Sequence, residues 1–180
     1  STRYFTLFPY TTLFRSPEAS EGDAVVVAAN FNAPGQVVIS GHVDAVARAS
    51  ELARARGARR VVPLPVSGAF HSPLMAPAED GLRAALETTP FADPAFPVVS
   101  NVTAEPVTTA AQARALLLRQ LTAPVRFADG VRRMREAGVA AFLEMGPGNV
   151  LSGLAKRVDR DAETRALGTA DEVRAFLEEA

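Results

Sequence analysis

The 180-residue chain is 48% apolar and 22% charged and has a formal net charge of −1, which is a globular composition and leaves room for one ordinary domain with or without a small lobe. Its 19 basic and 20 acidic residues are spread along the sequence, so we expect neither nucleic-acid nor membrane-surface binding, and the absence of cysteine excludes disulfides and thiolate nucleophiles and fits a cytoplasmic location. No stretch reaches the ~18 uninterrupted apolar residues that a membrane-spanning helix needs.

Residues 1–16, STRYFTLFPYTTLFRS, differ from everything that follows. They hold five aromatic residues, show neither a helical nor a strand period, and lack the charged start and the cleavage site of a signal peptide. The stretch resembles translated sequencing-adapter read-through. We therefore predict a non-native segment that takes no part in the fold, with a disordered native terminus as the alternative.

From Asp23 onward the pattern becomes regular. The sequence predicts a strand at residues 23–31, a turn at 32–35 (NAPG) and a second short strand at 36–41. Residues 43–56 repeat apolar positions with arginines between them, which predicts an amphipathic helix that ends at Gly57. Residues 58–66 predict the next strand.

In the remainder of the chain, predicted strands alternate with predicted helices. It predicts strands at 96–102, 139–145 and 164–168, a turn at 104–107, and helices at 74–87, 109–121, 126–137, 149–158 and 171–180. His71 lies in the loop that joins a strand to a helix. Strands alternating with helices predict an α/β fold with a mainly parallel sheet.

The two histidines do not form a metal motif. His42 and His71 are far apart in the sequence, without HExxH spacing and without a carboxylate cluster, so we expect no metal site. The segment 144–153, EMGPGNVLSG, has glycines at a strand-to-helix turn and could present backbone N–H groups to a phosphate. It lacks the GxGxxG and P-loop patterns, and a plain tight turn is the favoured interpretation.

Nucleophilic catalysis is the chemistry that a lone histidine suggests, because a serine that attacks an ester or thioester needs a base. His71 is the candidate base. The nucleophile elbow G-x-S-x-G is absent; Ser152 comes nearest but has Val150 where glycine is needed, and Ser72 adjoins His71 in the chain. On the residues alone, a satisfied core histidine remains the alternative.

Four separate blocks resemble the C-terminal half of the malonyl-CoA:acyl-carrier-protein transacylase family. They follow the family's order and rough spacing over residues 24–158, and they are NFNAPGQVVISG (30–41), VSGAFHSPLM (66–75), RQLTAPVRF (119–127) and EMGPGNVLSGLAKR (144–157). The resemblance implies that His71 is the general base. It also implies that the backbone carbonyl of Gln120 accepts the other imidazole proton, in place of an aspartate.

The resemblance also implies a division of the chain. Residues 24–62 would belong to a small ferredoxin-like lobe, and residues 63–180 would form the C-terminal part of an α/β-hydrolase-like acyltransferase lobe. The family's GHSxGE elbow, its oxyanion-hole glutamine and its malonyl-binding arginine belong to an N-terminal half that this sequence does not contain. We therefore expect a fragment that is inactive by itself.

The function implied is transfer of malonyl from coenzyme A to acyl carrier protein through an acyl-serine intermediate in fatty-acid biosynthesis. Malonyl-CoA and acyl carrier protein would be the partners, without a metal or redox cofactor. Phe70, in the AFH pattern that accompanies malonyl units in related domains, would set acyl-group selectivity. Two alternatives stay open: an acyltransferase domain of a modular polyketide synthase, and a non-catalytic carrier-protein-binding module.

Overall fold

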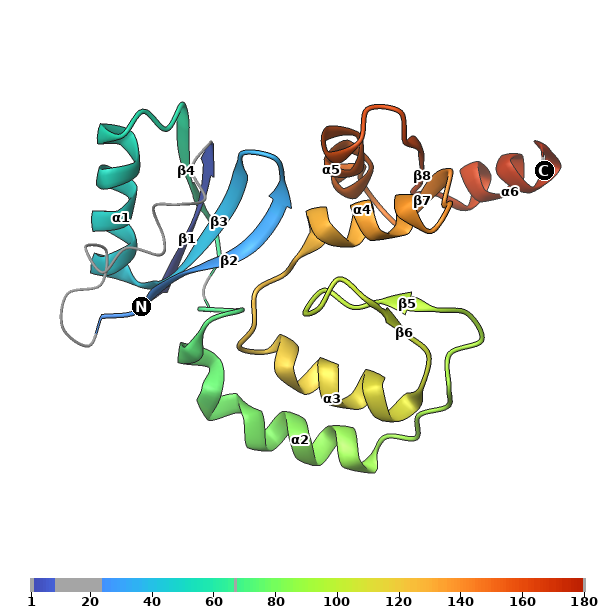
Figure 1. The fold of residues 1–180 in the computed structure, drawn as a ribbon, viewed down its shortest axis with the longest axis horizontal. Coiled ribbons are helices and arrows are strands. Elements are labelled where there is room, and N and C mark those ends of the chain that lie inside the picture. Colours follow the sequence, from blue (N-terminus) through green and yellow to red (C-terminus); the bar gives the residue numbers. More distant parts are fainter. Residues whose placement is uncertain (1, 9–23, 67, 180) are drawn as a thin grey trace. The chain divides into compact units, whose positions relative to one another are not determined.

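The computed structural model describes residues 2–8, 24–66 and 68–179, which fall into two compact units, Ser1–Gly130 and Val131–Ala180 (Figure 1). The lobe boundary expected at residue 62 therefore lies inside the first unit. That unit contains, in chain order, β1 (Thr2–Phe8), β2 (Val26–Ala33), β3 (Gln36–His42), α1 (Val43–Ala55), β4 (Arg60–Leu64), the 3-10 helix η3 (Pro73–Ala78), α2 (Glu79–Thr88), β5 (Val98–Val99), β6 (Pro106–Val107) and α3 (Ala110–Gln120).

A four-stranded antiparallel sheet forms the first part of this unit, with strand order β2-β3-β1-β4. The predicted succession of strand, turn and strand is confirmed and forms a hairpin: β2 and β3 are joined through Pro34 and Gly35, and Gly35 has a φ of 74°. A positive φ is where glycine is favoured, because a Cβ would clash with the backbone. Strand β2 is the edge that receives Val125, whose N–H donates to the Ala29 carbonyl at 2.8 Å.

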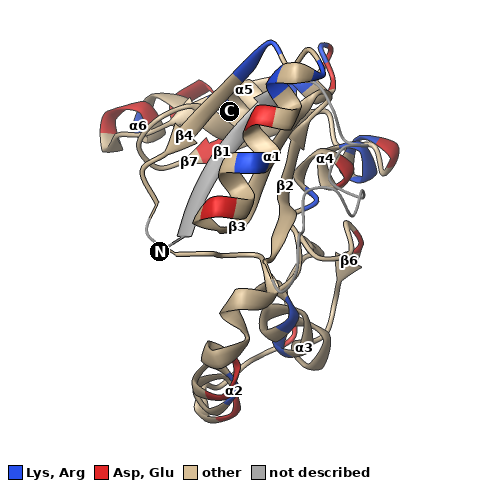
Figure 2. Cartoon of the chain, turned by 90° about the vertical axis from the view of Figure 1, so that its left-hand side faces the viewer, with Lys and Arg blue, Asp and Glu red and all other residues tan. Residues whose placement is uncertain are grey.

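Helix α1 covers one face of the sheet, with charged residues on its outer side (Figure 2). The spacing that predicted it is confirmed, and the buried stripe consists of small side chains, Ala45, Val46, Ala49 and Ala53. These pack on Val37 and Ile39 of β3, both essentially buried. At Gly41 a Cβ would lie 2.1 Å from the Val25 carbonyl oxygen, so the approach of β2 to β3 requires glycine there.

Residues 2–8 correct one expectation. The sequence led us to exclude residues 1–16 from the fold, but Thr2–Phe8 form β1, which pairs with β3 on one side and β4 on the other. The physical reason lies in composition, because TRYFTLF is rich in threonine and aromatic residues, which favour strands even without a regular alternation. Residues 9–16 lie outside the described residues.

Two further elements differ from their predicted form. The helix predicted at 74–87 is divided into η3 and α2, with Pro77 inside η3; proline lacks the N–H that an α-helix would use. The strand predicted at 96–102 is reduced to β5. Its partner β6 lies in residues predicted as a turn, after Ala104 reverses the chain with a φ of 60°.

The second unit is a β-α-β arrangement. It contains β7 (Ala141–Met145), α5 (Val150–Val158), β8 (Glu163–Leu167) and α6 (Ala170–Glu179), while α4 (Phe127–Glu136) begins before the unit boundary. Strands β7 and β8 pair in parallel, as a crossover helix permits. None of the helices in the described ranges is long and apolar enough to cross a membrane.

The mixed α/β class is confirmed, but the expectation of a mainly parallel sheet is wrong. Within the described ranges, β7 and β8 are the only named strands that pair in parallel, whereas all pairs of the larger sheet are antiparallel. Alternation along the chain specifies which elements follow one another. It does not specify which strands become neighbours.

The position of β1 yields a stability prediction. Replacing Thr2–Phe8 by seven glycine and serine residues should abolish the cooperative thermal melt or lower its midpoint strongly, because β3 and β4 would lose their shared partner. Circular dichroism on heating measures this. A replacement of equal length built from threonine and valine is the matched control and should retain the cooperative melt. A glycine-serine replacement that kept the same melting midpoint as this control and as the unaltered chain would show that β1 contributes nothing.

Candidate active site

His71 lies in the loop between β4 and η3 with an unusual backbone. Its φ is 60°, a left-handed conformation that is uncommon for residues other than glycine and costs free energy. Its backbone N–H donates to the Leu121 carbonyl at 3.2 Å. This bond holds the loop against the end of α3 and so fixes the position of the His71 backbone from which the imidazole extends.

The imidazole of His71 makes a further hydrogen bond to the C-terminal end of α3. Nδ1 of His71 lies 2.9 Å from the carbonyl oxygen of Gln120. A carbonyl can only accept, so this contact assigns the proton to Nδ1 and leaves a lone pair on Nε2. Within the described part of the chain no hydrogen bond engages Nε2. A half-buried histidine in this state has the form that a general base requires.

The end of α3 explains why these carbonyls are available. In a continuing helix the Gln120 carbonyl would accept from residue 124, but Pro124 has no N–H. The Leu121 carbonyl would accept from Val125, whose N–H donates instead to Ala29. Carbonyls at a helix C-terminus also carry partial negative charge, which strengthens them as acceptors for an N–H donor.

Phe70 and Ser72 flank the histidine and behave differently. Phe70 is 45% exposed, so it is not a core residue in the described structure, and its ring lies against the backbone of Gly68. Ser72 is fully buried: its hydroxyl donates to the Ala69 carbonyl at 2.7 Å and accepts from the Leu74 N–H. Ser72 therefore caps η3 and is occupied by the backbone.

His42 is engaged elsewhere. Its Nδ1 accepts a hydrogen bond from the Val25 N–H at 2.9 Å, at the point where β3 gives way to α1. Across the residues that the structure describes, no three His, Asp or Glu side chains gather as a metal ion would need.

The glycine-rich turn before α5 is closed by its own carboxylate. Glu144 at the end of β7 accepts hydrogen bonds from the backbone N–H groups of Ser152, at 2.7 Å, and Leu151, at 3.0 Å. These bonds, led by the one from Ser152, hold the pKa of Glu144 below its usual value. Two of the N–H groups that could have met a phosphate, those of Leu151 and Ser152, are therefore used internally, which supports the plain-turn interpretation.

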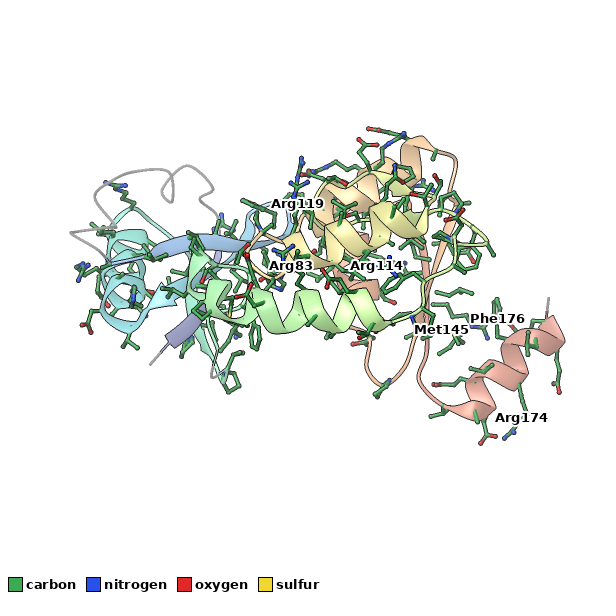
Figure 3. The ribbon with its side chains drawn as sticks, turned by 90° about the horizontal axis from the view of Figure 1, so that it is seen from below. Arg83, Arg114, Arg119, Met145, Arg174 and Phe176 are labelled. Atoms are coloured by element: carbon green, nitrogen blue, oxygen red, sulfur yellow. The ribbon has the colours of Figure 1, made fainter. Side chains whose placement is uncertain are left out.

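Among the described residues, cavities lie on two sides of α3. One, of about 260 Å³, is mainly apolar and has Gln120 in its wall together with Val99 and Leu117. The other, of about 460 Å³, lies between α2 and α3 and includes three arginines, Arg83, Arg114 and Arg119 (Figure 3). The guanidinium of Arg114 also stacks over the Phe91 ring at 4.9 Å.

The structure brings His71 and Gln120 together although 49 positions separate them. Sequence reasoning missed the Leu121 carbonyl as a second anchor and the side-chain amide of Gln120, which donates to Ala123. Backbone carbonyls have no signature of residue type. The one available signal was Pro124, four residues after Gln120, which marks a helix carbonyl without its usual donor.

Comparisons with known proteins converge on one family. The model of the acyl transferase domain matches residues 13–174. The malonyl CoA-acyl carrier protein transacylase of Bacillus subtilis (strain 168) is 45% identical over 150 residues, which are 83% of this chain and 47% of the relative. That of Staphylococcus aureus (strain COL) is 38% identical over 159 residues, 88% and 52% respectively. The chain thus spans about half the length of the curated relatives it matches.

Solved structures give the same picture. A malonyl-transacylase in complex with its type II PKS acyl-carrier protein is 37% identical with a TM-score of 0.93, over 100% of this chain and 59% of that one. An acyl carrier protein S-malonyltransferase from Vibrio cholerae is 38% identical with a TM-score of 0.91, over 97% and 58%.

The two histidines should be in opposite neutral tautomers. His71 should carry its proton on Nδ1, which donates to Gln120, and His42 on Nε2, because its Nδ1 accepts from Val25. Long-range ¹H–¹⁵N correlation of the imidazole nitrogens at a pH where both rings are neutral distinguishes these forms, and His42→Ala assigns the signals. An Nε2-protonated His71 would contradict the arrangement.

Proposed function

The chain belongs to the acyl transferase domain family, and we propose that it supplies the general base of an [acyl-carrier-protein] S-malonyltransferase. The observation that carries the proposal is the His71–Gln120 contact. It leaves Nε2 of His71 with a lone pair and no competing donor among the described residues. The names of the relatives support the choice of malonyl-CoA and acyl carrier protein as substrates.

The first half-reaction would load the enzyme. Nε2 of His71 takes the proton from a serine hydroxyl as the serine oxygen bonds to the thioester carbon of malonyl-CoA. The tetrahedral intermediate collapses, the carbon–sulfur bond breaks, and the imidazolium returns the proton to the departing coenzyme A thiolate. The Gln120 carbonyl would stabilise the imidazolium through the Nδ1 proton.

The second half-reaction would use the same nitrogen again. Nε2 takes the proton of the phosphopantetheine thiol on acyl carrier protein, and the thiolate sulfur bonds to the ester carbon of malonyl-serine. The carbon–oxygen bond breaks and the serine oxygen recovers the proton from His71. Acyl exchange of this kind balances without a metal ion or a redox cofactor.

We propose that the serine nucleophile is not among these 180 residues. The sequence contains no G-x-S-x-G, and Ser72, the serine adjacent to His71, is buried and bonded to the backbone. The chain by itself should therefore be inactive. A role as a carrier-protein-binding module without catalysis is the alternative that an activity measurement decides.

His71 should be essential once a nucleophile is supplied. In a chimera where residues 24–179 replace the matching half of the Bacillus subtilis relative, His71→Ala should lower malonyl transfer by about 10²- to 10⁴-fold, the range for loss of a positioned base. Transfer of label from malonyl-CoA to acyl carrier protein measures this.

Matched variants separate chemistry from folding in that chimera. His42→Ala removes the other histidine and should leave turnover nearly unchanged, while His71→Asn tolerates the left-handed backbone and should be as inactive as His71→Ala. If His71→Ala kept more than about half of the activity, the core-histidine interpretation would replace the catalytic one. Enzyme-like transfer by the 180-residue chain alone would refute the missing nucleophile.

Phe70 should discriminate against an α-methyl group. Its ring is exposed beside His71, and Phe70→Ser in the chimera should raise the kcat/KM for methylmalonyl-CoA relative to malonyl-CoA by about 10- to 200-fold, the range for one methyl in a pocket wall. Phe96→Ser, a change at another exposed phenylalanine, is the control and should leave the ratio unchanged. An unaltered ratio for Phe70→Ser would place selectivity elsewhere.

A further inference from the structure

The side chain of Gln120 makes contacts that its backbone role does not require. Its Nε2 lies 3.1 Å from the Ala123 carbonyl and 3.3 Å from Nδ1 of His71. The amide orientation follows from these neighbours, because Oε1 in that position would set one carbonyl oxygen against another. The Nδ1 proton points to the Gln120 carbonyl, so the amide donates to Ala123.

The bond to Ala123 links the side chain of Gln120 to the backbone three residues later, next to the Gln120 carbonyl that accepts from His71. Beyond α3 the backbone N–H groups of Leu121 and Thr122 reach carbonyls three residues back at 3.3 Å, a tightened last turn with long bonds, and the Ala123 N–H reaches the Arg119 carbonyl at 3.0 Å. Pro124 can donate nothing to this turn. The Gln120 amide therefore ties the turn from inside, and the Gln120 carbonyl that it orients is the one that meets His71.

A second contact fastens the turn from outside. The hydroxyl of Thr122 donates to Glu79 at the start of α2, but at 3.4 Å this is a weak bond. The carboxamide of Gln120 is the stronger restraint. The carboxamide is also half-buried, and its 3.3 Å approach to Nδ1 of His71 joins two N–H groups and adds no hydrogen bond, so its restraint comes from the bond to Ala123.

We infer that the side-chain amide of Gln120 is a positioning group that holds the carbonyl acceptor, and with it the Nδ1-protonated tautomer, of His71. Its catalytic meaning rests on the proposed function, because a fixed tautomer matters for transfer only if Nε2 is the base. Gln120 touches neither substrate nor reacting atoms in this account; it acts through His71.

The test compares two glutamines of α3. In the 180-residue chain, Gln120→Leu should lower the Nδ1-protonated fraction of neutral His71 and speed hydrogen exchange of the His71 backbone N–H by about tenfold or more. Gln112→Leu, at the other end of the helix, removes an amide that accepts from Thr108 and should change neither. A merely structural glutamine would affect folding without moving the tautomer.

The unaltered chain provides a measurement that does not depend on variants folding. The Gln120 carboxamide protons should exchange with solvent about tenfold more slowly than those of Gln112, whose NH₂ has no partner among the described residues. Equal exchange rates would overturn the inference, as would an unchanged His71 tautomer in Gln120→Leu.

The chimera then separates this inference from the proposed function. Gln120→Leu should lower kcat about tenfold with KM nearly unchanged, less than the 10²-fold that a 1 Å misplacement can cost. A chimera that transfers no malonyl group although His71 keeps its Nδ1 proton would defeat the proposed function and leave the positioning role standing. Full kcat in Gln120→Leu would overturn the positioning role alone.

Discussion

The candidate site depends on a carbonyl that its own helix leaves unused. A proline four residues after Gln120 withholds the donor that a continuing helix would bring, and Val125 directs its N–H to Ala29 of the sheet. Two successive carbonyls are thus left open by two different causes. His71 meets both of them, one with its backbone and one with its ring. The sheet, the helix end and the loop are joined through these few bonds.

A carbonyl in this role differs from the carboxylate of a serine–histidine–aspartate triad. It fixes the same tautomer, because it too can only accept, but it carries a partial charge where aspartate carries a full one. It stabilises an imidazolium less, and it adds no second titrating group beside the base. The arrangement also imposes a left-handed backbone at His71, so the site stores strain in the loop rather than burying a charge.

Much of the local structure could be predicted from patterns along the chain. NAPG between two short apolar runs gives the hairpin, and the spacing from Val43 gives α1, because each depends on neighbours a few residues apart. Strand β1 could not be predicted from periodicity, because residues 2–8 do not alternate regularly between apolar and polar side chains. The strand partners could not be predicted either, because an alternation of strands and helices along the chain does not specify which strands pair. The approach of His71 to Gln120 spans 49 positions, and only a family resemblance suggested it.

The carboxylate that caps α5 makes the stability of this helix in the second unit depend on pH. Glu144 accepts from the N–H groups of Leu151 and Ser152 in the first turn of the helix, and its pKa is lowered in the folded chain by those bonds, foremost the one from Ser152. A group with a lowered folded pKa contributes stability above its unfolded pKa and loses that contribution as the pH falls through the folded value. Below that range the start of α5 would lose its acceptor. In acid, the turn that joins β7 to α5 would therefore lose this stabilisation.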